Sequence, residues 1–175
     1  VFRAQELEGG KPAEFEQMGI EVIGDDSIYA DTEVILTTID LMKRLGIESF
    51  KITIGHAGIL EAIIRKNVQT EEQFTELHQL LVNRNYVGFE EAVDRFVLTT
   101  EQASTLKSFI EEATSLTNMR QISKYLYEKE ALIYMEQLAS ILEIAGVQEY
   151  VAFDFTIASH MNYYTGMMFE VFAAN

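Results

Sequence analysis

Apolar and polar residues alternate along the stretch from Phe15 to Gly24, near the start of the chain. Alternation with a period of two is typical of a strand that buries one of its faces. The stretch therefore predicts a strand with two chemically distinct sides. Its apolar positions are Met18, Ile20 and Val22, and the positions between them are Gln17, Gly19 and Glu21.

After this stretch the apolar spacing changes to that of a helix. Ser27 is placed to cap its N-terminus, acidic residues crowd its first turn, and Lys43 and Arg44 lie in its last turn. Gly46 is expected to end the helix, because glycine adopts the left-handed conformation that helix ends require. "FKITIGH", residues 50–56, then predicts a second strand.

The apolar spacing is helical over residues 58–146. Residues 55–58, "GHAG", lead into this region and predict a strand-to-helix turn, since they are too few to form a phosphate-binding loop. Thr70–Gln73 and Thr99–Gln102 both carry the capping-box pattern, in which a threonine and a later glutamine bind backbone N–H groups at the start of a helix. We interpret them as two helix starts and not as a repeat.

The order of the elements predicts an α+β fold. Two further strand-like runs, residues 150–157 and 163–172, follow the helices, so we expect a mostly antiparallel or mixed sheet flanked by helices, with a helical insertion at about 58–146. There is one proline and no Gly/Ser-rich linker, which indicates a single domain over residues 1–175. The chain begins at Val1 without a methionine, and we interpret it as a piece of a longer protein.

Composition excludes several classes of function. The formal net charge of −15 argues against tRNA or other nucleic acid as a partner, because nucleic-acid binding depends on Lys and Arg. The absence of cysteine excludes thiolate catalysis and disulfides, and makes the cytoplasm the default location. No apolar run is long enough to span a bilayer, so no membrane partner is expected. The three histidines lack the spacing of metal ligands, and we expect neither a metal nor a cofactor.

Two glycines occur inside the predicted strands. Gly19 lies between Gln17 and Glu21 on the polar side of the first strand. Gly166 shares one side of the last strand with Tyr164. A glycine within a strand often marks a place where a ligand lies against the backbone, so neighbouring strands would form a floor for a small polar molecule. The alternative that the pattern leaves open is that both glycines mark bulges and that Glu21 faces solvent.

Two blocks resemble signature motifs of the class II aminoacyl-tRNA synthetases in their histidyl version. "FRAQELEGGKPAEFEQMGIEVIG", residues 2–24, is similar to a motif that runs from "FR-x-E" through a basic loop to "EF-x-Q-x-G-x-E". "ASHMNYYTGMMFE", residues 158–170, resembles "RG-x-DYYTG" running into "FE". The helix start "DSIYADTEVI" fits the same family, whereas the middle of the chain matches only in being helical.

The resemblance implies a class II synthetase-like core with a pocket for free histidine. It implies that Gln17 contacts the α-ammonium group, that Glu21 and Tyr164 contact the two imidazole nitrogens, and that Tyr163 helps to wall the site. Gly19 and Gly166 would provide the floor, in agreement with the pattern of faces. A carboxylate and a phenol are suited to the two ring nitrogens of imidazole.

The chain departs from the synthetase pattern at the positions that activate the amino acid. Arg3 is retained as a residual phosphate contact, but Gln5 replaces a glutamate and Ala13 replaces an arginine. Lys11 replaces another arginine and lacks its bidentate fork. Ser159 stands where the family has the arginine that bridges the substrate carboxylate and the α-phosphate, and a serine is neutral and too short for this role. We therefore expect that the chain has no catalytic residues of its own.

A synthetase-like protein that keeps histidine recognition and loses activation resembles the regulatory subunits of ATP phosphoribosyltransferase. The resemblance implies feedback control of the first step of histidine biosynthesis by free histidine. It also implies that the short-form catalytic subunit, as partner, needs this subunit for activity, in a hetero-octamer, with self-association as a dimer at full length. The acidic middle, with nine acidic and three basic residues over 69–117, opposes tRNA binding. The alternatives are a catalytic-core fragment of histidyl-tRNA synthetase and a free-standing histidine-binding regulator.

Overall fold

The computed structural model describes residues 14, 16–113, 119–126, 129–159 and 165–173. Among these residues there are three strands, seven helices and a short 3-10 helix, η2. The strands are β1 (Phe50–His56), β2 (Val151–Phe153) and β3 (Met167–Ala173). The helices are α1 (Ile28–Arg44), α2 (Ala57–Asn67), α3 (Glu71–Val82), α4 (Tyr86–Arg95), α5 (Thr100–Ala113), α6 (Met119–Ile122) and α7 (Glu130–Ile144), and η2 spans Gln148–Tyr150.

The described sheet is small and mixed, with β1 in the centre and the strand order β2-β1-β3. β2 pairs with β1 in parallel, and Ile54 lies opposite Phe153. β3 pairs with β1 in antiparallel fashion, and Ile54 lies opposite Phe169. The predicted α+β class is confirmed, but a mostly antiparallel sheet is not, because a short crossover strand lies beside β1 in the parallel direction.

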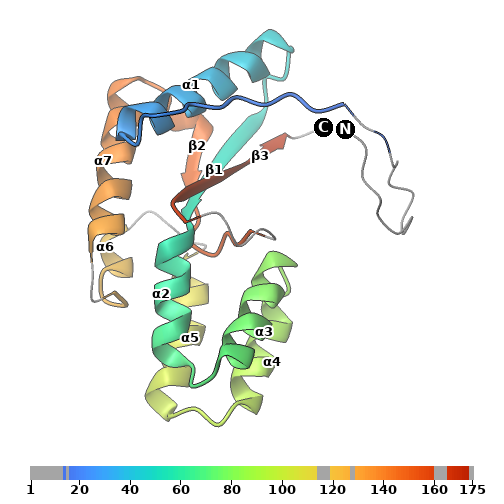
Figure 1. The fold of residues 1–175 in the computed structure, drawn as a ribbon, viewed down its shortest axis with the longest axis vertical. Coiled ribbons are helices and arrows are strands. Elements are labelled where there is room, and N and C mark those ends of the chain that lie inside the picture. The colour runs from blue at the N-terminus through green and yellow to red at the C-terminus, as the bar shows by residue number, and fades with distance from the viewer. Residues whose placement is uncertain (1–13, 15, 114–118, 127–128, 160–164, 174–175) are drawn as a thin grey trace.

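One face of the sheet is the hydrophobic face. Ile52 and Ile54 of β1 are fully buried there, in one cluster with Ile35 of α1 and Leu138 of α7. α1 and α7 pack against each other on this side (Figure 1). Burial of one large aliphatic side chain contributes about 1.5–3 kcal/mol, so this layer holds the sheet in place. The other face, which we call the open face, carries Lys51, Thr53 and Gly55 from β1 and Met168, Glu170 and Phe172 from β3.

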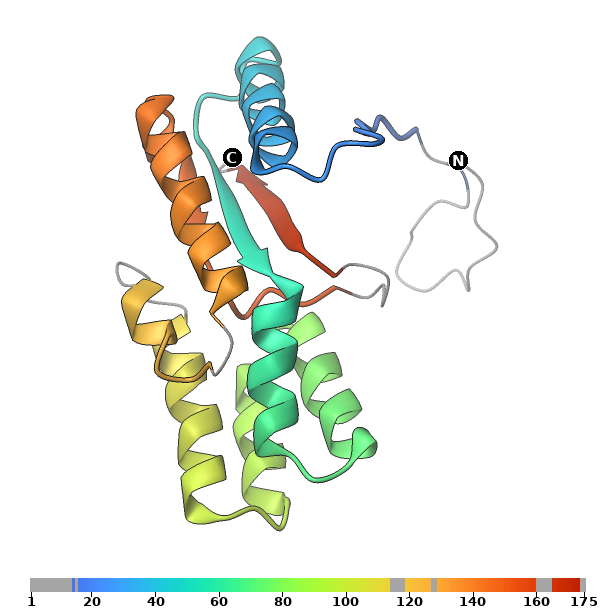
Figure 2. The same ribbon diagram turned by 60° about the vertical axis from the view of Figure 1, so that its left-hand side comes forward.

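The helices between β1 and α7 form a separate layer beyond the end of the sheet. α2 continues directly from β1, and α3, α4 and α5 lie beside it (Figures 1 and 2). α3 packs against α4, and α2 packs against α5. Leu77, Phe89 and Phe109 are fully buried among them. We call residues 57–126 the helical segment.

Several helix boundaries follow the local signals in the sequence, but Ser27, at the N-cap position of α1, makes no side-chain capping hydrogen bond. The backbone N–H of Gln73 donates to the Thr70 hydroxyl (3.3 Å), and that of Gln102 donates to the Thr99 hydroxyl (3.2 Å). The Thr99 N–H in turn donates to the Gln102 side chain (2.9 Å), which completes a reciprocal capping box. Gly46 follows α1 with a φ of 75°, as expected of a residue that ends a helix.

Three predicted strands differ from the structure: the first is not formed among the described residues, and the other two are shorter than predicted. Residues 16–24 have no regular secondary structure and are exposed, because a strand needs a partner for its backbone groups and this stretch has none among the described residues. β2 ends at Phe153 rather than at residue 157. The Asp154 carboxylate accepts from the N–H (2.8 Å) and the hydroxyl (2.6 Å) of Thr156, and this turn ends the strand. The last strand begins at Met167, and residues 163 and 164 lie outside the described residues.

The "GHAG" stretch is a strand-to-helix turn, as predicted. His56 lies at the N-cap position of α2, and its imidazole Nδ1 accepts from the Gly58 N–H (3.1 Å). The ring also contacts Tyr134 edge-on, with centroids 6.5 Å apart. A side chain of the protein itself therefore occupies the position at which a bound anion would meet this helix terminus.

Gly55 is the position at which β1 tolerates no side chain. A Cβ there would lie 2.6 Å from the Asp154 carbonyl oxygen and 3.1 Å from the Ile157 Cβ. We predict that Gly55→Ala lowers the free energy of unfolding by about 1–3 kcal/mol, because the buried turn above it must move. Urea denaturation measures this value, and Gly19→Ala, with open space around the Cβ, should change it by less than about 0.5 kcal/mol. An unchanged midpoint for Gly55→Ala would contradict the described contact.

The His56 cap predicts a pH dependence of stability. Burial lowers the pKa of the His56 imidazole below its ordinary value of 6.5, and the nearby Asp31 carboxylate partly opposes this shift. As pH falls below about 6.5 the unfolded chain binds the proton first, so the stabilisation is complete above that pH and is lost towards the lowered pKa. His56→Asn retains a capping oxygen and does not titrate.

Denaturation of both proteins between pH 7.5 and 5 measures this contribution. The wild type should lose stability with falling pH more steeply than the His56→Asn variant. Parallel curves would show that protonation of His56 does not contribute to the pH dependence of stability in this range.

Candidate functional site

The open face of the sheet carries polar and aromatic side chains that are exposed or half-buried. Glu170 and Phe172 of β3 lie on it, opposite Thr53 and Lys51 of β1. Towards the other end of β3 the same face carries Met168, and a turn of residues 154–157 covers Gly55. The face is therefore closed at one end by the turn and accessible along β3.

Gly166 is placed at the start of β3, at the end of the open face. Its carbonyl oxygen accepts from the Ala57 N–H (3.0 Å), which joins the beginning of β3 to the beginning of α2. No atom of the described residues lies within 4 Å of a Cβ built on Gly166. The described residues therefore leave room above this glycine, and its role as a floor for a ligand stays a prediction.

The other predicted site residues are not assembled around Gly166 among the described residues. Gln17, Gly19 and Glu21 lie on the exposed stretch that precedes α1, and a Cβ at Gly19 would also meet open space. Arg3, Tyr163 and Tyr164 lie outside the described residues, as do the positions of the other synthetase substitutions near the N-terminus. The arrangement of the six predicted histidine-binding residues around one ligand therefore stays a prediction.

A cleft of about 460 Å³ lies where the helical segment meets the sheet. Its walls come from α2, α3, residues 157–159 and Met168, and Ser159 is one of its lining residues. Arg65 is the only arginine or lysine among the described residues that line it. The Arg65 guanidinium donates to Glu61 (2.7 Å) and to both oxygens of Glu71 (2.6 and 3.0 Å), and these contacts raise its pKa.

The Arg65 guanidinium, which is paired with two carboxylates, also stacks on an aromatic ring. Its guanidinium carbon lies 3.8 Å from the centroid of the Phe74 ring, and Phe74 stacks on His78 with centroids 5.7 Å apart. The two carboxylates and the ring hold the cation at the rim of the cleft. Among its described lining residues the cleft therefore lacks a free arginine of the kind that stabilises a developing phosphate charge.

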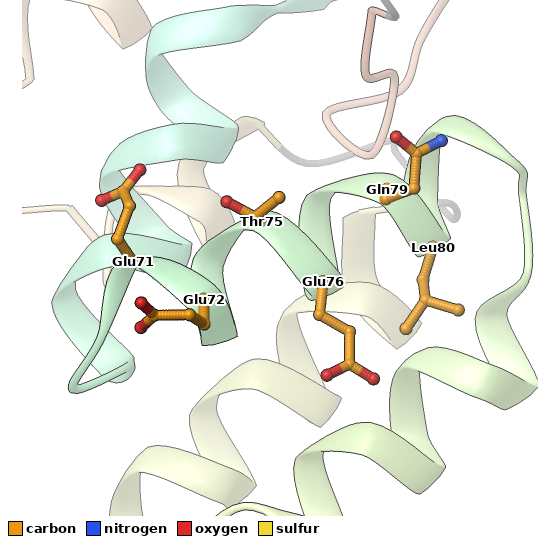
Figure 3. A pocket seen from close by; sticks show the side chains of 6 residues that line it. All are labelled: Glu71, Glu72, Thr75, Glu76, Gln79 and Leu80. Carbon is orange, nitrogen blue, oxygen red and sulfur yellow. The ribbon is translucent and has the colours of Figure 1, made fainter.

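A second hollow runs along the outer side of α3, with a volume of about 610 Å³. Figure 3 shows that all of its lining side chains project from this one helix. It is a shallow hollow rather than an enclosed site, since all of its described lining residues belong to one helix. Its lining residues are Glu71, Glu72, Thr75, Glu76, Gln79 and Leu80.

Sequence reasoning missed the residues that join the helical segment to the sheet. Arg84, in the turn between α3 and α4, forms an ion pair with Glu170 of β3. The Tyr86 hydroxyl hydrogen-bonds the buried Thr156 hydroxyl (3.2 Å). Both contacts join residues far apart in sequence, and only the backbone turn around Arg84 could have been inferred locally.

Two further observations concern only the described part of the chain. No group of three or more His, Asp or Glu side chains there is arranged to hold a metal ion. No helix there combines the length and the apolar character that crossing a membrane requires.

The whole chain, residues 1–175, matches the family model described as histidyl-tRNA synthetase. It is 60% identical over 173 residues to the ATP phosphoribosyltransferase regulatory subunit of Lysinibacillus sphaericus, covering 99% of this chain and 45% of that protein. The corresponding protein of Bacillus subtilis is 41% identical over 178 residues, covering 100% of this chain and 46% of that protein. The chain thus spans a little under half the length of these curated relatives.

Solved structures share the fold of this chain. The regulatory subunit/histidyl-tRNA synthetase of Bacillus halodurans superposes with a TM-score of 0.86 at 39% identity, over 99% of this chain and 46% of that one. The ATP phosphoribosyl transferase (HisG:HisZ) complex of Thermotoga maritima contains a chain with the same fold, at a TM-score of 0.69, 16% identity, and coverage of 86% of this chain and 53% of that one. The chain belongs to the histidyl-tRNA synthetase family, and its similar relatives within that family include regulatory subunits of ATP phosphoribosyltransferase.

Proposed function

We propose that the chain is the histidine-recognising part of a non-catalytic regulatory subunit of ATP phosphoribosyltransferase. In this role it binds free histidine for feedback control of the first step of histidine biosynthesis, and the short-form catalytic subunit requires it for activity. The observation that carries the proposal is the 60% identity to such a subunit over nearly the whole chain.

The ligand site of this proposal combines the exposed stretch with the open face. β3 lies at the edge of the described sheet, and an edge strand offers unpaired N–H and C=O groups to a further strand. Residues 16–24 have the alternating pattern that such a strand needs, with apolar residues on one side. Addition of this stretch beside β3 would bring Gln17, Gly19 and Glu21 next to Gly166 and its preceding tyrosines.

Histidine fits this site by its chemistry. Glu21 and Tyr164 would bind the two imidazole nitrogens, Gln17 would bind the α-ammonium group, and Tyr163 would wall the ring. A pocket that pairs each polar group of its ligand strongly rejects analogues that lack those groups. No cofactor or metal is needed for this recognition.

The proposed function does not include the activation of histidine that a synthetase performs. Ser159 faces the cleft between the helical segment and the sheet, where an arginine would be needed to bridge a carboxylate and a phosphate. Arg65 does not replace it, because Glu61 and Glu71 already bind its guanidinium. Arg3 remains as a residual phosphate contact, whereas the uncharged Ala13 stands where the family has an arginine. These substitutions support a regulator rather than an enzyme.

The proposed partners are those that the family resemblance implies. The short-form catalytic subunit joins the full-length protein in a hetero-octamer, with self-association of the full-length protein as a dimer. The complex takes no tRNA, because the net charge of −15 repels a polyanion. The proposed location is the cytoplasm, where histidine biosynthesis supplies the ligand.

A catalytic-core fragment of histidyl-tRNA synthetase is the alternative, favoured by the description of the matching family model. Histidine-dependent exchange of pyrophosphate with ATP by the full-length protein would establish it. Ser159 and the acidic helical segment are the observations against it.

The site predicts how substitutions change histidine affinity. We predict that Glu21→Ala weakens histidine binding by about ten- to a hundredfold, because an imidazole nitrogen loses a charged partner worth roughly 1.5–3 kcal/mol. Tyr164→Phe removes a neutral hydroxyl worth about 1 kcal/mol, or roughly fivefold. Gly19→Val should abolish binding by filling the floor. Calorimetric titration of histidine into the full-length protein measures each value.

Glu16→Ala is the matched control, since it removes a carboxylate from the same exposed stretch but on the opposite side of the alternating pattern. It should bind histidine like the wild type. A folded Glu21→Ala protein with unchanged affinity would place the ligand elsewhere.

A further inference from the structure

The turn between α3 and α4 reaches back from the helical segment to the open face of the sheet. Asn83, Arg84 and Asn85 form it, and their N–H groups donate to Gln79, Leu81 and Leu80 carbonyl oxygens at 2.8–3.1 Å. Arg84 has a φ of 54°, and it is the only non-glycine residue with positive φ among the described residues. The left-handed conformation is unfavourable for a residue with a side chain, so the hydrogen bonds of the turn hold the Arg84 backbone in it.

The Arg84 side chain crosses to β3. Its guanidinium forms an ion pair with Glu170 and lies 4.7 Å from the centroid of the Phe172 ring. Both partners are on the open face, on the same side of β3 as Met168. Arg84 therefore brings a cation of the helical segment onto the face that carries Gly166 at its other end.

A second contact fixes the same turn region. Tyr86, the first residue of α4, bonds Thr156 through its hydroxyl (3.2 Å), and Thr156 is only 2% exposed. The Asp154 carboxylate holds Thr156 from the other side. Between the two contacts lies a cavity of about 20 Å³, which includes Arg84, Tyr86 and Glu170 in its lining. The contact region between the α3–α4 turn and the sheet is thus polar and incompletely filled, unlike the apolar layers on either side of it.

We propose that Arg84 is a positioning residue that holds the helical segment over the open face, so that histidine binding and the Arg84–Glu170 contact stabilise each other. The inference rests on the proposed histidine site. The Arg84 and Glu170 side chains are 51% and 43% exposed, and an exposed ion pair changes an equilibrium by about fivefold at most. Such a weak contact forms and breaks reversibly, as a regulatory element requires, and coupling between two sites acts equally in both directions.

The test compares two arginines of the helical segment in the full-length protein. Arg84→Gln breaks the contact with β3. Arg95→Gln is the matched control, because Arg95 also pairs with an exposed glutamate, Glu76, and also lies over a ring, that of Phe96, without reaching the sheet.

Hydrogen exchange without ligand should be about two- to fivefold faster at the α3–α4 turn in Arg84→Gln than in Arg95→Gln. Histidine affinity should be about two- to fivefold weaker in Arg84→Gln and unchanged in Arg95→Gln. Added histidine should slow exchange at this turn in the wild type and much less in Arg84→Gln. The double variant Arg84→Glu with Glu170→Arg exchanges the two charges. It should restore most of the histidine affinity and exchange protection that either single reversal loses.

The outcomes separate the two ideas. Equal exchange and equal histidine affinity in Arg84→Gln and Arg95→Gln would overturn the positioning role. Faster exchange in Arg84→Gln with unchanged histidine affinity would overturn the coupling and leave Arg84 as a purely structural contact. If the wild type binds no histidine at all, the proposed function fails and the coupling fails with it, while exchange without ligand still decides whether Arg84 holds the segment.

Discussion

The placement of β1 between two strands determines the rest of this structure. β1 is paired in parallel with β2 and antiparallel with β3, and its apolar residues on one side are fully buried under α1 and α7. Its other side ends at Gly55, on which the 154–157 turn lies with no room for a side chain. α2 starts directly after β1 and is capped by its last residue, so the same strand also aims the helical segment. A shift of β1 would displace the open face and the segment together.

Elements determined by neighbouring residues were predictable from the sequence. The capping boxes at Thr70 and Thr99 and the glycine after α1 act within a few residues, and the structure confirms them. The stretch 16–24 was predicted as a strand from its alternation alone, but alternation does not supply the partner that completes a strand. β2 is shorter than predicted because the Asp154 side chain bonds the backbone locally and turns the chain.

The candidate site was predictable only in part, for a different reason. Gly19 and Gly166 were singled out as floor positions from the strand pattern, and the described residues leave space around both, but their part in a ligand site stays a prediction. The roles of Gln17, Glu21 and the two tyrosines come from the family resemblance and depend on a strand pairing that spans almost the whole chain. The Arg84–Glu170 contact joins residues 86 positions apart, and no pattern in either stretch indicates it. Long-range side-chain pairs of this kind require the fold before they can be seen.

In the proposed function this chain recognises histidine, and another subunit performs the chemistry. Histidine can change the activity of a partner only through the difference between its affinities for two states of the complex. The most direct measurement is the turnover of a short-form ATP phosphoribosyltransferase, alone and with the full-length protein that contains this chain, at increasing histidine concentrations. The account predicts that the added protein raises turnover and that histidine then lowers it, with Glu21→Ala shifting the inhibition to higher histidine concentration. A full-length protein that leaves turnover unchanged at every histidine concentration would contradict the account.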